Sequence, residues 1–434
     1  MGLNLVLLSN TPNCSSGYGV QARYLLPELR KRGHRCNVLA FWGLEGGIIE
    51  ANGMRIYPKG TDPYGNDVAA ATCQHAGADV LITLIDAWVL QDFPQKAPWA
   101  RWLAWCPIDS EPAPPPVIDR LKNAYYVLPF SQHGVQECEK AGLTNFYGER
   151  NVRYMPLGVS TAVYGPYYDR RAAKKALGFP EDCFLVGMVA ANKGNPSRKA
   201  FDRQFEAFAR FRERHPEAYL YCHAEPTQVY GGVDLVAEAQ SYGLPPGAVR
   251  FPDRYLNWLG FPDTWMARMY CAFDVLASAS QGEGFGIPIV EAMTCGVRVI
   301  GTDFTSMREL IEHQLTGYKV RVAERWKTPL RSYQALPDVA DIAEGFEWAW
   351  NQPRGVSEVC MEFGRQFEWG RLADLFWQPL LQEIESRIAP SARVAKPAAD
   401  EIEWPVVATY PEYRGGDDRD VLTVAPLAGE KVQP

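Results

Sequence analysis

The sequence predicts an α/β protein made of two Rossmann-like domains, each a doubly wound parallel sheet, with a cleft between them. Three observations support this. The chain has 434 residues, which is long for one ordinary hydrophobic core. An apolar run at residues 3–9 is followed by a polar, glycine-containing loop, a helical segment at about 20–32 and another apolar run at 36–41. A second series of strands and helices begins at residue 184.

Short apolar segments continue the pattern in the first half of the chain. Strands are expected at residues 79–84, 99–106, 124–129 and 152–156, and a helix at 132–140. Strands that alternate with helices in this way are typical of a parallel sheet with helices on its faces. We expect the first domain to cover residues 1–165.

The second half shares the architecture without repeating the sequence. Strands are expected at residues 184–189, 218–222, 249–251 and 318–320, and helices at 198–214, 266–273 and within 337–351. Apolar residues at helical spacing predict a last helix over 372–387. We expect the second domain to cover residues 166–369. Residues 391–434 hold five prolines and 8 acidic against 5 basic residues, which indicates an extended or disordered acidic tail, although residues 401–409 could dock as a strand.

Residues 274–301, DVLASASQGEGFGIPIVEAMTCGVRVIG, form the most informative part of the sequence. The run predicts a strand, a glycine turn, a helix and a second strand, at residues 274–280, 282–286, 289–295 and 297–300. Glycines in a strand-to-helix turn let backbone N–H groups approach a ligand, and a helix N-terminus favours anions. Glu283 and Glu291 lie in this unit, and carboxylates accept hydrogen bonds from sugar hydroxyls. The unit therefore predicts a ligand that is partly phosphate and partly sugar.

This unit resembles the E-x7-E signature of the retaining glycosyltransferases of family 4, which have the GT-B fold. The resemblance implies that Glu283 holds hydroxyls of the transferred sugar and that Glu291 holds the ribose of the nucleotide. It also implies that the last helix, about residues 370–388, crosses back to complete the first domain. The donor would face the backbone amides of four residues in the turn, Gly284, Phe285, Gly286 and Ile287.

Two basic residues follow the strand at 184–189. Arg198 and Lys199 are expected in the first turn of the helix at 198–214, where cations oppose the helix dipole and therefore need an anionic partner or solvent. The segment GMVAANKGNPSRKAF resembles the family segment whose Arg and Lys clamp the pyrophosphate of the donor, and Asn192 lies within it. We expect Arg198 and Lys199 to act in catalysis and Asn192 to bind the donor.

Polar residues also follow the expected strands of the first domain. Asp109 lies in CPIDSEP, near the place where many members of the family carry a histidine. A carboxylate there orients a sugar hydroxyl or the acceptor, and a helix cap or turn is the alternative role. Gly17 and Gly19 lie after the first strand, where open α/β sheets bind ligands, and are expected to face the donor. Ser16 and His133 are expected on the acceptor side.

Composition and charge exclude several other classes of protein. No two of the ten cysteines lie within twenty residues of each other, and C-x-x-C and H-x-H pairs are absent, so the sequence gives no sign of a zinc site. We expect no metal site, because the D-x-D at 418–420 falls in the tail. The net charge of −7 argues against a surface that binds nucleic acid or anionic lipid throughout. No apolar run approaches the ~20 residues of a transmembrane segment, and no signal peptide is recognisable, so a cytoplasmic protein is expected.

Together, the residues and the resemblance predict a retaining glycosyltransferase that requires no metal cofactor and uses a nucleoside-diphosphate sugar as co-substrate. A carbohydrate or lipid-linked sugar is the expected acceptor. Nucleic acid is less favoured, because the first 160 residues hold 14 basic and 14 acidic residues and carry no overall field that attracts a polyanion. Three alternatives stay open: transfer to a hydroxylated base in DNA, a nucleotide-sugar epimerase or phosphorylase of the same fold, and a non-catalytic sugar-nucleotide-binding protein.

Overall fold

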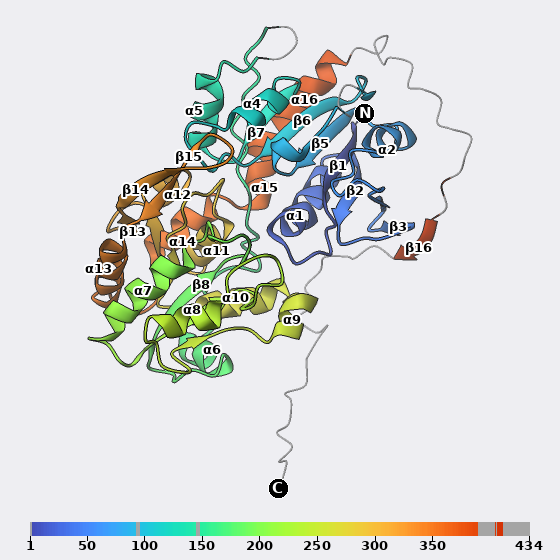
Figure 1. The fold of residues 1–434 in the computed structure, drawn as a ribbon. Coiled ribbons are helices and arrows are strands. Elements are labelled where there is room, and N and C mark those ends of the chain that lie inside the picture. Colours follow the sequence, from blue (N-terminus) through green and yellow to red (C-terminus); the bar gives the residue numbers. More distant parts are fainter. Residues whose placement is uncertain (1, 93–95, 145–147, 389–403, 405, 411–434) are drawn as a thin grey trace.

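The computed structural model describes residues 2–92, 96–144, 148–388, 404 and 406–410. Its two large sheets lie in the upper and lower parts of Figure 1, each with helices packed around it. A small antiparallel hairpin, β14 (Val322–Lys327) and β15 (Tyr333–Pro337), forms a third sheet. The predicted α/β fold with two Rossmann-like sheets is thereby confirmed.

The first sheet has the strand order β16-β3-β4-β2-β1-β5-β6-β7, and only β3 and β4 pair antiparallel. Its strands are β1 (Asn4–Asn10), β2 (Arg35–Trp42), β3 (Ile48–Ala51), β4 (Met54–Pro58), β5 (Val80–Leu84), β6 (Arg101–Cys106), β7 (Tyr126–Pro129) and β16 (Val406–Tyr410). The helical segments between them are α1 (Gly17–Lys31), α2 (Ala69–His75), the 3-10 turn η1 (Ala87–Val89), α4 (Pro115–Leu121) and α5 (Gln132–Lys140).

The second sheet has the strand order β10-β9-β8-β11-β12-β13, with every neighbouring pair parallel. Its strands are β8 (Phe184–Val189), β9 (Ala218–His223), β10 (Val249–Arg250), β11 (Val275–Ser278), β12 (Arg298–Thr302) and β13 (Gly317–Val320). Its helices are α6 (Arg170–Ala176), α7 (Phe201–Arg212), α8 (Leu235–Ser241), α9 (Arg254–Leu259), α10 (Asp263–Ala272), α11 (Ile287–Thr294), α12 (Met307–Leu310), α13 (Val339–Trp350) and α14 (Glu358–Arg365).

Each sheet is buried on both faces, which explains why its strands read as continuous apolar runs. Side chains alternate across a strand, so Leu7 of β1 packs in one core and Leu8 in another. In β8, Leu185 shares the core that contains Leu7, whereas Val186 packs in a third core. One core therefore contains side chains from both sheets and joins the two halves of the molecule.

The chain returns to the first sheet after α14. α15 (Trp369–Leu372), the π-helical turn η2 (Ala373–Trp377) and α16 (Gln378–Arg387) follow one another beside β6 and β7 in Figure 1. The rings of Trp377 and Trp105 of β6 meet edge to face at 5.0 Å, and the hydroxyl of Tyr126 of β7 donates a hydrogen bond to Glu383 at 2.5 Å. These contacts hold the last helices on the first sheet. The boundary near residue 165 stays a prediction.

Two segments differ from expectation. Residues 152–156 do not form a strand; Val152 makes only an isolated bridge to Val127. Part of the expected tail is ordered: β16 pairs with β3 at the edge of the first sheet, and Trp404 stacks on His75 with ring centroids 4.5 Å apart. The edge strand gains hydrogen bonds, and Trp404 gains apolar contact. The rest of residues 391–434 lies outside the described residues.

Within the described part of the chain, none of the helices has both the length and the apolar character that crossing a membrane requires.

Candidate active site

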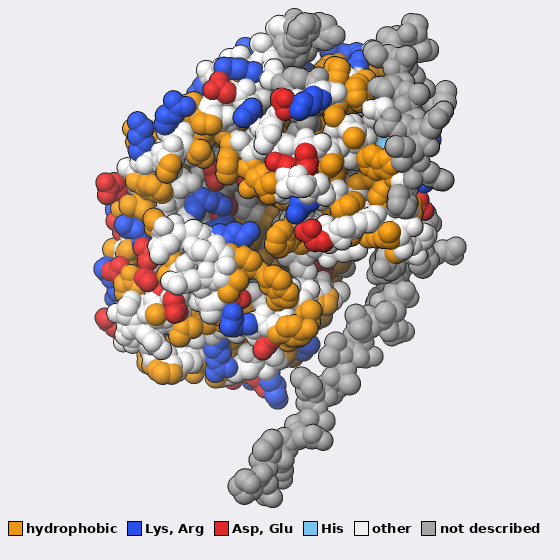
Figure 2. Space-filling view, turned by 45° about the vertical axis from the view of Figure 1, so that its right-hand side comes forward, with side chains coloured by type: hydrophobic (Ala, Val, Ile, Leu, Met, Phe, Trp, Pro, Cys, Tyr) orange, Lys and Arg blue, Asp and Glu red, His pale blue; other side chains and the backbone are white. Residues whose placement is uncertain are grey.

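The loops that follow β6 in the first sheet and β11 in the second meet at the interface of the two halves. A Cβ atom on Gly282 would stand 2.1 Å from the carbonyl oxygen of Asp109, and one on Gly284 would stand 2.3 Å from the Cβ of Pro107. Only glycine allows so close an approach. In Figure 2 the surface is hollowed near its centre, and basic side chains border the hollow.

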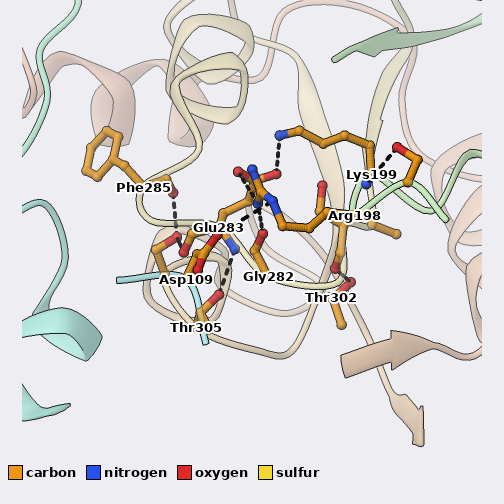
Figure 3. A network of polar contacts seen from close by, with 12 residues as sticks. Asp109, Arg198, Lys199, Gly282, Glu283, Phe285, Thr302 and Thr305 are labelled. Atoms are coloured by element: carbon orange, nitrogen blue, oxygen red, sulfur yellow. Dashed lines mark hydrogen bonds and ion pairs between the residues drawn. The ribbon is translucent and has the colours of Figure 1, made fainter. Parts of the chain in front are cut away.

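Four of the predicted catalytic side chains form one charge network at this interface (Figure 3). Lys199 Nζ lies 2.5 Å from Glu283 Oε1, and Arg198 Nη1 lies 3.2 Å from Glu283 Oε2. Arg198 Nε lies 3.5 Å from Asp109 Oδ2, and Arg198 also donates a hydrogen bond to the carbonyl of Gly282. Two cations from one loop of the second domain therefore face one carboxylate of each domain.

The ion pairs determine how these groups ionise. Desolvation opposes the charge on Glu283, but Lys199 and Arg198 outweigh it and lower the pKa of Glu283 to about 2. Desolvation lowers the pKa of Lys199, although Glu283 acts against this. For Arg198, desolvation is outweighed by Glu283 and Asp109, which raise its pKa. The carboxylate of Glu283 is therefore fully ionised at neutral pH and lies between two cations.

The basic pair is held in a turn, which corrects the expectation that it opens the helix. Ala200 has a left-handed backbone with a φ of 47°, and α7 begins only after it. Gln204 of that helix donates a side-chain hydrogen bond to the carbonyl of Lys199 at 2.7 Å. The amide of Gln281 donates to the carbonyl of Arg198 at 2.8 Å. Contacts to their main-chain carbonyls therefore position Arg198 and Lys199. The two residues precede α7, so they do not lie in its first turn, where the helix dipole would oppose their charge.

Residues after β12 brace the glycine turn, and sequence reasoning missed them. Thr305 Oγ1 accepts a hydrogen bond from the amide of Glu283 at 2.9 Å. Ser306 Oγ lies 2.8 Å from the carbonyl oxygen of Glu283 and 2.7 Å from that of Phe285. Thr302 donates to the carbonyl of Ser280 at 2.6 Å. A signal was present, because polar residues at the carboxyl end of a strand beside β11 must reach this edge of the sheet.

The hydrogen bonds from Thr305 and Ser306 do not use the backbone amides of residues 284–287. Residues 284–287 donate no backbone hydrogen bond to another described residue. Gly286 has a φ of 106°, which a side chain would strain, and it serves as the N-cap of α11. The turn therefore presents several N–H groups at a helix N-terminus, an arrangement that suits an anion. The ring of Phe285 instead packs against Phe367, with centroids 5.4 Å apart.

Glu291 lies outside the charge network, on the buried side of α11. It is 7% exposed, and its Oε2 accepts a hydrogen bond from the hydroxyl of Tyr270 at 2.7 Å. Burial raises the pKa of Glu291 to about 7, although hydrogen bonds from Tyr270 and Tyr164 act in the opposite direction. The negative charge of Asp263 adds to the rise.

This raised pKa predicts a stability effect that a single substitution isolates. The pKa is higher in the folded state than the ordinary value of 4.5, so the folded protein binds the proton more tightly. Stability should therefore fall as pH rises from about 5 through 7, by up to about 3 kcal/mol from this group. Glu291→Gln should lack the effect, so the variant should gain stability relative to the parent between pH 5 and pH 8 in urea unfolding. A difference that stays constant with pH would contradict it.

The structure gives Asn192 a different role from donor binding. Its Nδ2 donates to the backbone carbonyls of Glu225, Thr227 and Val233, at 2.7 to 3.2 Å. Its Oδ1 accepts from the amide of Val233 at 2.9 Å. These contacts use the hydrogen-bonding capacity of a side chain that is 2% exposed. Asn192 therefore holds the loop after β9, and its expected contact with the donor stays a prediction.

The expected acceptor-side residues are used in the fold as well. Ser16 is the N-cap of α1, and its hydroxyl accepts from the amide of Gly19 at 3.1 Å. A Cβ on Gly19 would stand 2.3 Å from the carbonyl of Cys14, whereas Gly17 has open space around it. His133 Nε2 lies 3.2 Å from the carbonyl of Ser110, and burial lowers the pKa of its ring. Ser16 and His133 therefore stabilise the loops, and their expected contacts with the acceptor stay predictions.

Two side chains of the first domain belong to the site and were not anticipated. Tyr18, in the first turn of α1, and Asp86, in the loop after β5, each interact electrostatically with Asp109 and Arg198. Both follow carboxyl ends of strands, which was the available signal. Among the described residues, no three His, Cys, Asp or Glu side chains are grouped so as to hold a metal ion.

The geometry agrees with comparisons to known proteins. The family model described as "Glycosyl transferases group 1" matches residues 184–329. D-inositol 3-phosphate glycosyltransferase of Segniliparus rotundus is 26% identical over 254 residues, which cover 55% of this chain and 49% of that protein. N-acetyl-alpha-D-glucosaminyl L-malate synthase of Bacillus anthracis is 36% identical over 86 residues, 20% of this chain and 22% of that protein. The chain spans about half the length of the first of these relatives.

Solved structures show the same fold over most of the chain. Sucrose-phosphate synthase from Thermosynechococcus elongatus has a TM-score of 0.66 and 19% identity, covering 88% of this chain and 99% of its own. Anabaena Alr3699/HepE in complex with UDP and glucose has a TM-score of 0.63 and 16% identity, covering 88% and 100%. Residues 184–329 therefore match the group 1 glycosyl transferases, and the chain has the predicted GT-B fold over most of its length.

Proposed function

We propose that the protein is a retaining glycosyltransferase that moves a sugar from a nucleoside-diphosphate sugar to an acceptor hydroxyl. The observation that carries this proposal is the network of Arg198, Lys199, Glu283 and Asp109 beside the unpaired amides of residues 284–287. The relatives named above are transferases and synthases of sugar derivatives, and one solved relative holds UDP and glucose.

The charge of each residue determines its proposed role. Arg198 and Lys199 would leave part of their pairing with Glu283 to bind the pyrophosphate of the donor and stabilise the charge that grows as it departs. The amides of the turn would add hydrogen bonds to the same phosphates. Glu283 would then accept hydrogen bonds from hydroxyls of the transferred sugar. Glu291, as a carboxylate, would accept hydrogen bonds from the ribose.

The acceptor is proposed to be a carbohydrate or a lipid-linked sugar. By name, the curated relatives act on an inositol phosphate or on malate, so the acceptor varies among proteins of this type. Nucleic acid is not favoured, because the acceptor half carries no excess of basic residues. We also propose a cytoplasmic location, which suits ten cysteines that are all free thiols.

The test is a binding and turnover screen with the full chain. UDP-, GDP- and ADP-sugars would be titrated by calorimetry, and release of nucleoside diphosphate would be followed with and without a mixture of sugar acceptors. Acceptor-dependent release is expected for one of the donors. Conversion of the donor without an acceptor would favour an epimerase, whereas phosphate-dependent release of sugar 1-phosphate from a glycan would favour a phosphorylase. Donor binding without any turnover would favour a non-catalytic binding protein.

The donor assignment predicts a loss of nucleotide affinity in a Glu291 variant. Removing a hydrogen bond to a charged group costs roughly 1.5–3 kcal/mol, which is about 10- to 150-fold in affinity. Glu291→Ala should therefore weaken binding of the free nucleoside diphosphate by that factor in calorimetry. Unchanged affinity in a folded variant would remove Glu291 from the donor site.

Metal independence is a separate prediction of this proposal. The two cations of the network carry out the charge stabilisation that a divalent ion provides in other transferases. Transfer activity should therefore survive EDTA within about twofold. Loss of activity in EDTA that Mg²⁺ or Mn²⁺ restores would show that the cation pair is insufficient.

A further inference from the structure

The first-domain wall of the site carries two carboxylates and a tyrosine from three neighbouring strands. β1, β5 and β6 are parallel neighbours, so their carboxyl ends meet at one edge of the sheet. Tyr18 follows β1, Asp86 follows β5 and Asp109 follows β6. The ladder pairs Leu84 with Trp105, which brings the start of the Asp86 loop beside the start of the Asp109 loop. The three side chains therefore lie together opposite the proposed donor loops.

Asp86 differs from the other acids of the site because no described cation forms an ion pair with it, although Arg198 and Lys193 interact with it electrostatically. Glu283 is paired with Lys199 and Arg198, and Asp109 is paired with Arg198. The side chain of Asp86 reaches solvent, although the surrounding protein desolvates its carboxylate, which makes no ion pair and no hydrogen bond to another described side chain. It is therefore free to accept hydrogen bonds from a ligand.

Tyr18 is a second, independent feature of this wall. Its ring is half-buried and meets Phe130 edge to face, with centroids 6.4 Å apart. Its hydroxyl makes no hydrogen bond to a described residue, and burial raises its pKa, as do the charges of Asp86 and Asp109. An amphipathic ring beside two carboxylates suits a sugar ring, which has apolar C–H faces and hydroxyl edges.

The charges of the site favour one class of acceptor over another. Arg198 and Lys199 are balanced by Glu283 and Asp109, and the charge of Asp86 is opposed by Lys193, which makes no ion pair with it. A bound donor adds the negative charge of its pyrophosphate. A phosphorylated acceptor would place a further anion beside these groups, whereas a neutral polyol offers O–H donors to the carboxylates.

We propose that Asp86 and Asp109, with the ring of Tyr18, form the acceptor subsite, and that the acceptor presents an uncharged sugar or polyol there. The inference rests on the proposed function and names the substrate class of that same site. Asp86 accepts hydrogen bonds from the acceptor and orients its reacting hydroxyl towards the donor.

The test compares Asp86→Asn with the parent protein and with Asp119→Asn, an exposed acid of α4 that pairs only with Lys122. With the donor found by calorimetry, methyl α-glucoside and myo-inositol would be the neutral acceptors and glucose 6-phosphate the charged one. The parent should use the neutral acceptors at least about tenfold better in kcat/KM. Asp86→Asn should raise the KM of the neutral acceptors by about tenfold or more and leave the donor Kd within about twofold. The ratio of kcat/KM between the neutral acceptors and glucose 6-phosphate should therefore be smaller in this variant than in the parent.

A pH profile provides a readout that a merely structural role would not give. Desolvation by the surrounding protein and the charge of Asp109 raise the pKa of Asp86 to about 6. Acceptor kcat/KM of the parent should fall as pH drops through about 6, because a protonated carboxyl accepts hydrogen bonds less well. In Asp86→Asn the acceptor kcat/KM should not show this fall at low pH. The charged or titratable groups that interact with Asp86 are Asp109, Arg198, Lys193, Tyr18 and Cys106.

The outcomes separate this inference from the proposed function. An unchanged acceptor KM in Asp86→Asn, with donor binding intact, would overturn the subsite alone, as would a parent that prefers glucose 6-phosphate. Unchanged donor binding also shows that the Asp86→Asn variant is folded. Asp86→Glu keeps the carboxylate and should therefore retain more acceptor affinity than Asp86→Asn. A parent protein that binds no nucleotide sugar would overturn the proposed function, and the subsite with it.

Discussion

Replacing Arg198 by alanine is expected to lower turnover about 100- to 1,000-fold, the usual effect of removing one group that stabilises charge in a transition state. Arg198 lies between Glu283 and Asp109 and donates to the carbonyl of Gly282, so it meets both domains at the proposed site of bond cleavage. Removing it leaves Lys199 as the partner of Glu283. The pyrophosphate should then lose its bidentate partner.

Binding experiments locate this effect at the phosphates. The nucleoside diphosphate should lose affinity in Arg198→Ala, whereas the nucleoside alone should bind as in the parent. Arg210→Ala is the matched control, because Arg210 is exposed on α7 and pairs only with Glu206. Arg198→Lys should restore part of the turnover. Equal losses for nucleoside and diphosphate would place Arg198 away from the phosphates.

Gly282→Ala is the second substitution with a large expected effect, because it separates the two domains where their backbones meet at the site. The new Cβ would stand 2.1 Å from the carbonyl oxygen of Asp109, so one backbone must move. A displacement of about 1 Å between reacting groups costs on the order of 100-fold in rate. We therefore expect transfer to fall about 100-fold while nucleoside-diphosphate affinity, which depends mainly on the second domain, changes less than about tenfold.

The control for Gly282→Ala is the substitution Gly370→Ala. The nearest atom to its added Cβ is a side-chain oxygen of Glu368 at 3.1 Å, which can rotate away. Gly370→Ala should keep full transfer activity. If Gly282→Ala did the same, the contact between Gly282 and Asp109 would not matter for catalysis.

Several site residues follow from local sequence because their positions depend on local structure. The strand, glycine turn and helix of residues 274–301 are formed by neighbours in the chain, so the positions of Glu283 and Gly286 follow from the pattern. Gly296 has a φ of 77°, as expected for the residue after a helix. The α/β fold likewise follows from apolar runs at regular spacing.

Other features could not be predicted because the deciding partner is distant in sequence. The side-chain amide of Asn192 forms hydrogen bonds with the loop around Val233. Ala200 adopts a left-handed backbone that delays α7 and places Arg198 and Lys199 in a turn. The ring of His133 lies against the carbonyl of Ser110, which follows another strand. Local propensity contains no information about such contacts.

The sequence by itself determined the two parallel-sheet domains, the glycine turn and the presence of two basic residues that need an anionic partner or solvent. Only the tertiary structure decided that Asp109 of one domain pairs with Arg198 of the other, that Thr305 and Ser306 brace the turn, and that Asp86 interacts with Asp109 and Arg198. The physical reason is that periodicity and turn chemistry are properties of neighbouring residues, whereas the site is assembled from strand ends that are distant in the chain and adjacent only after the sheets form.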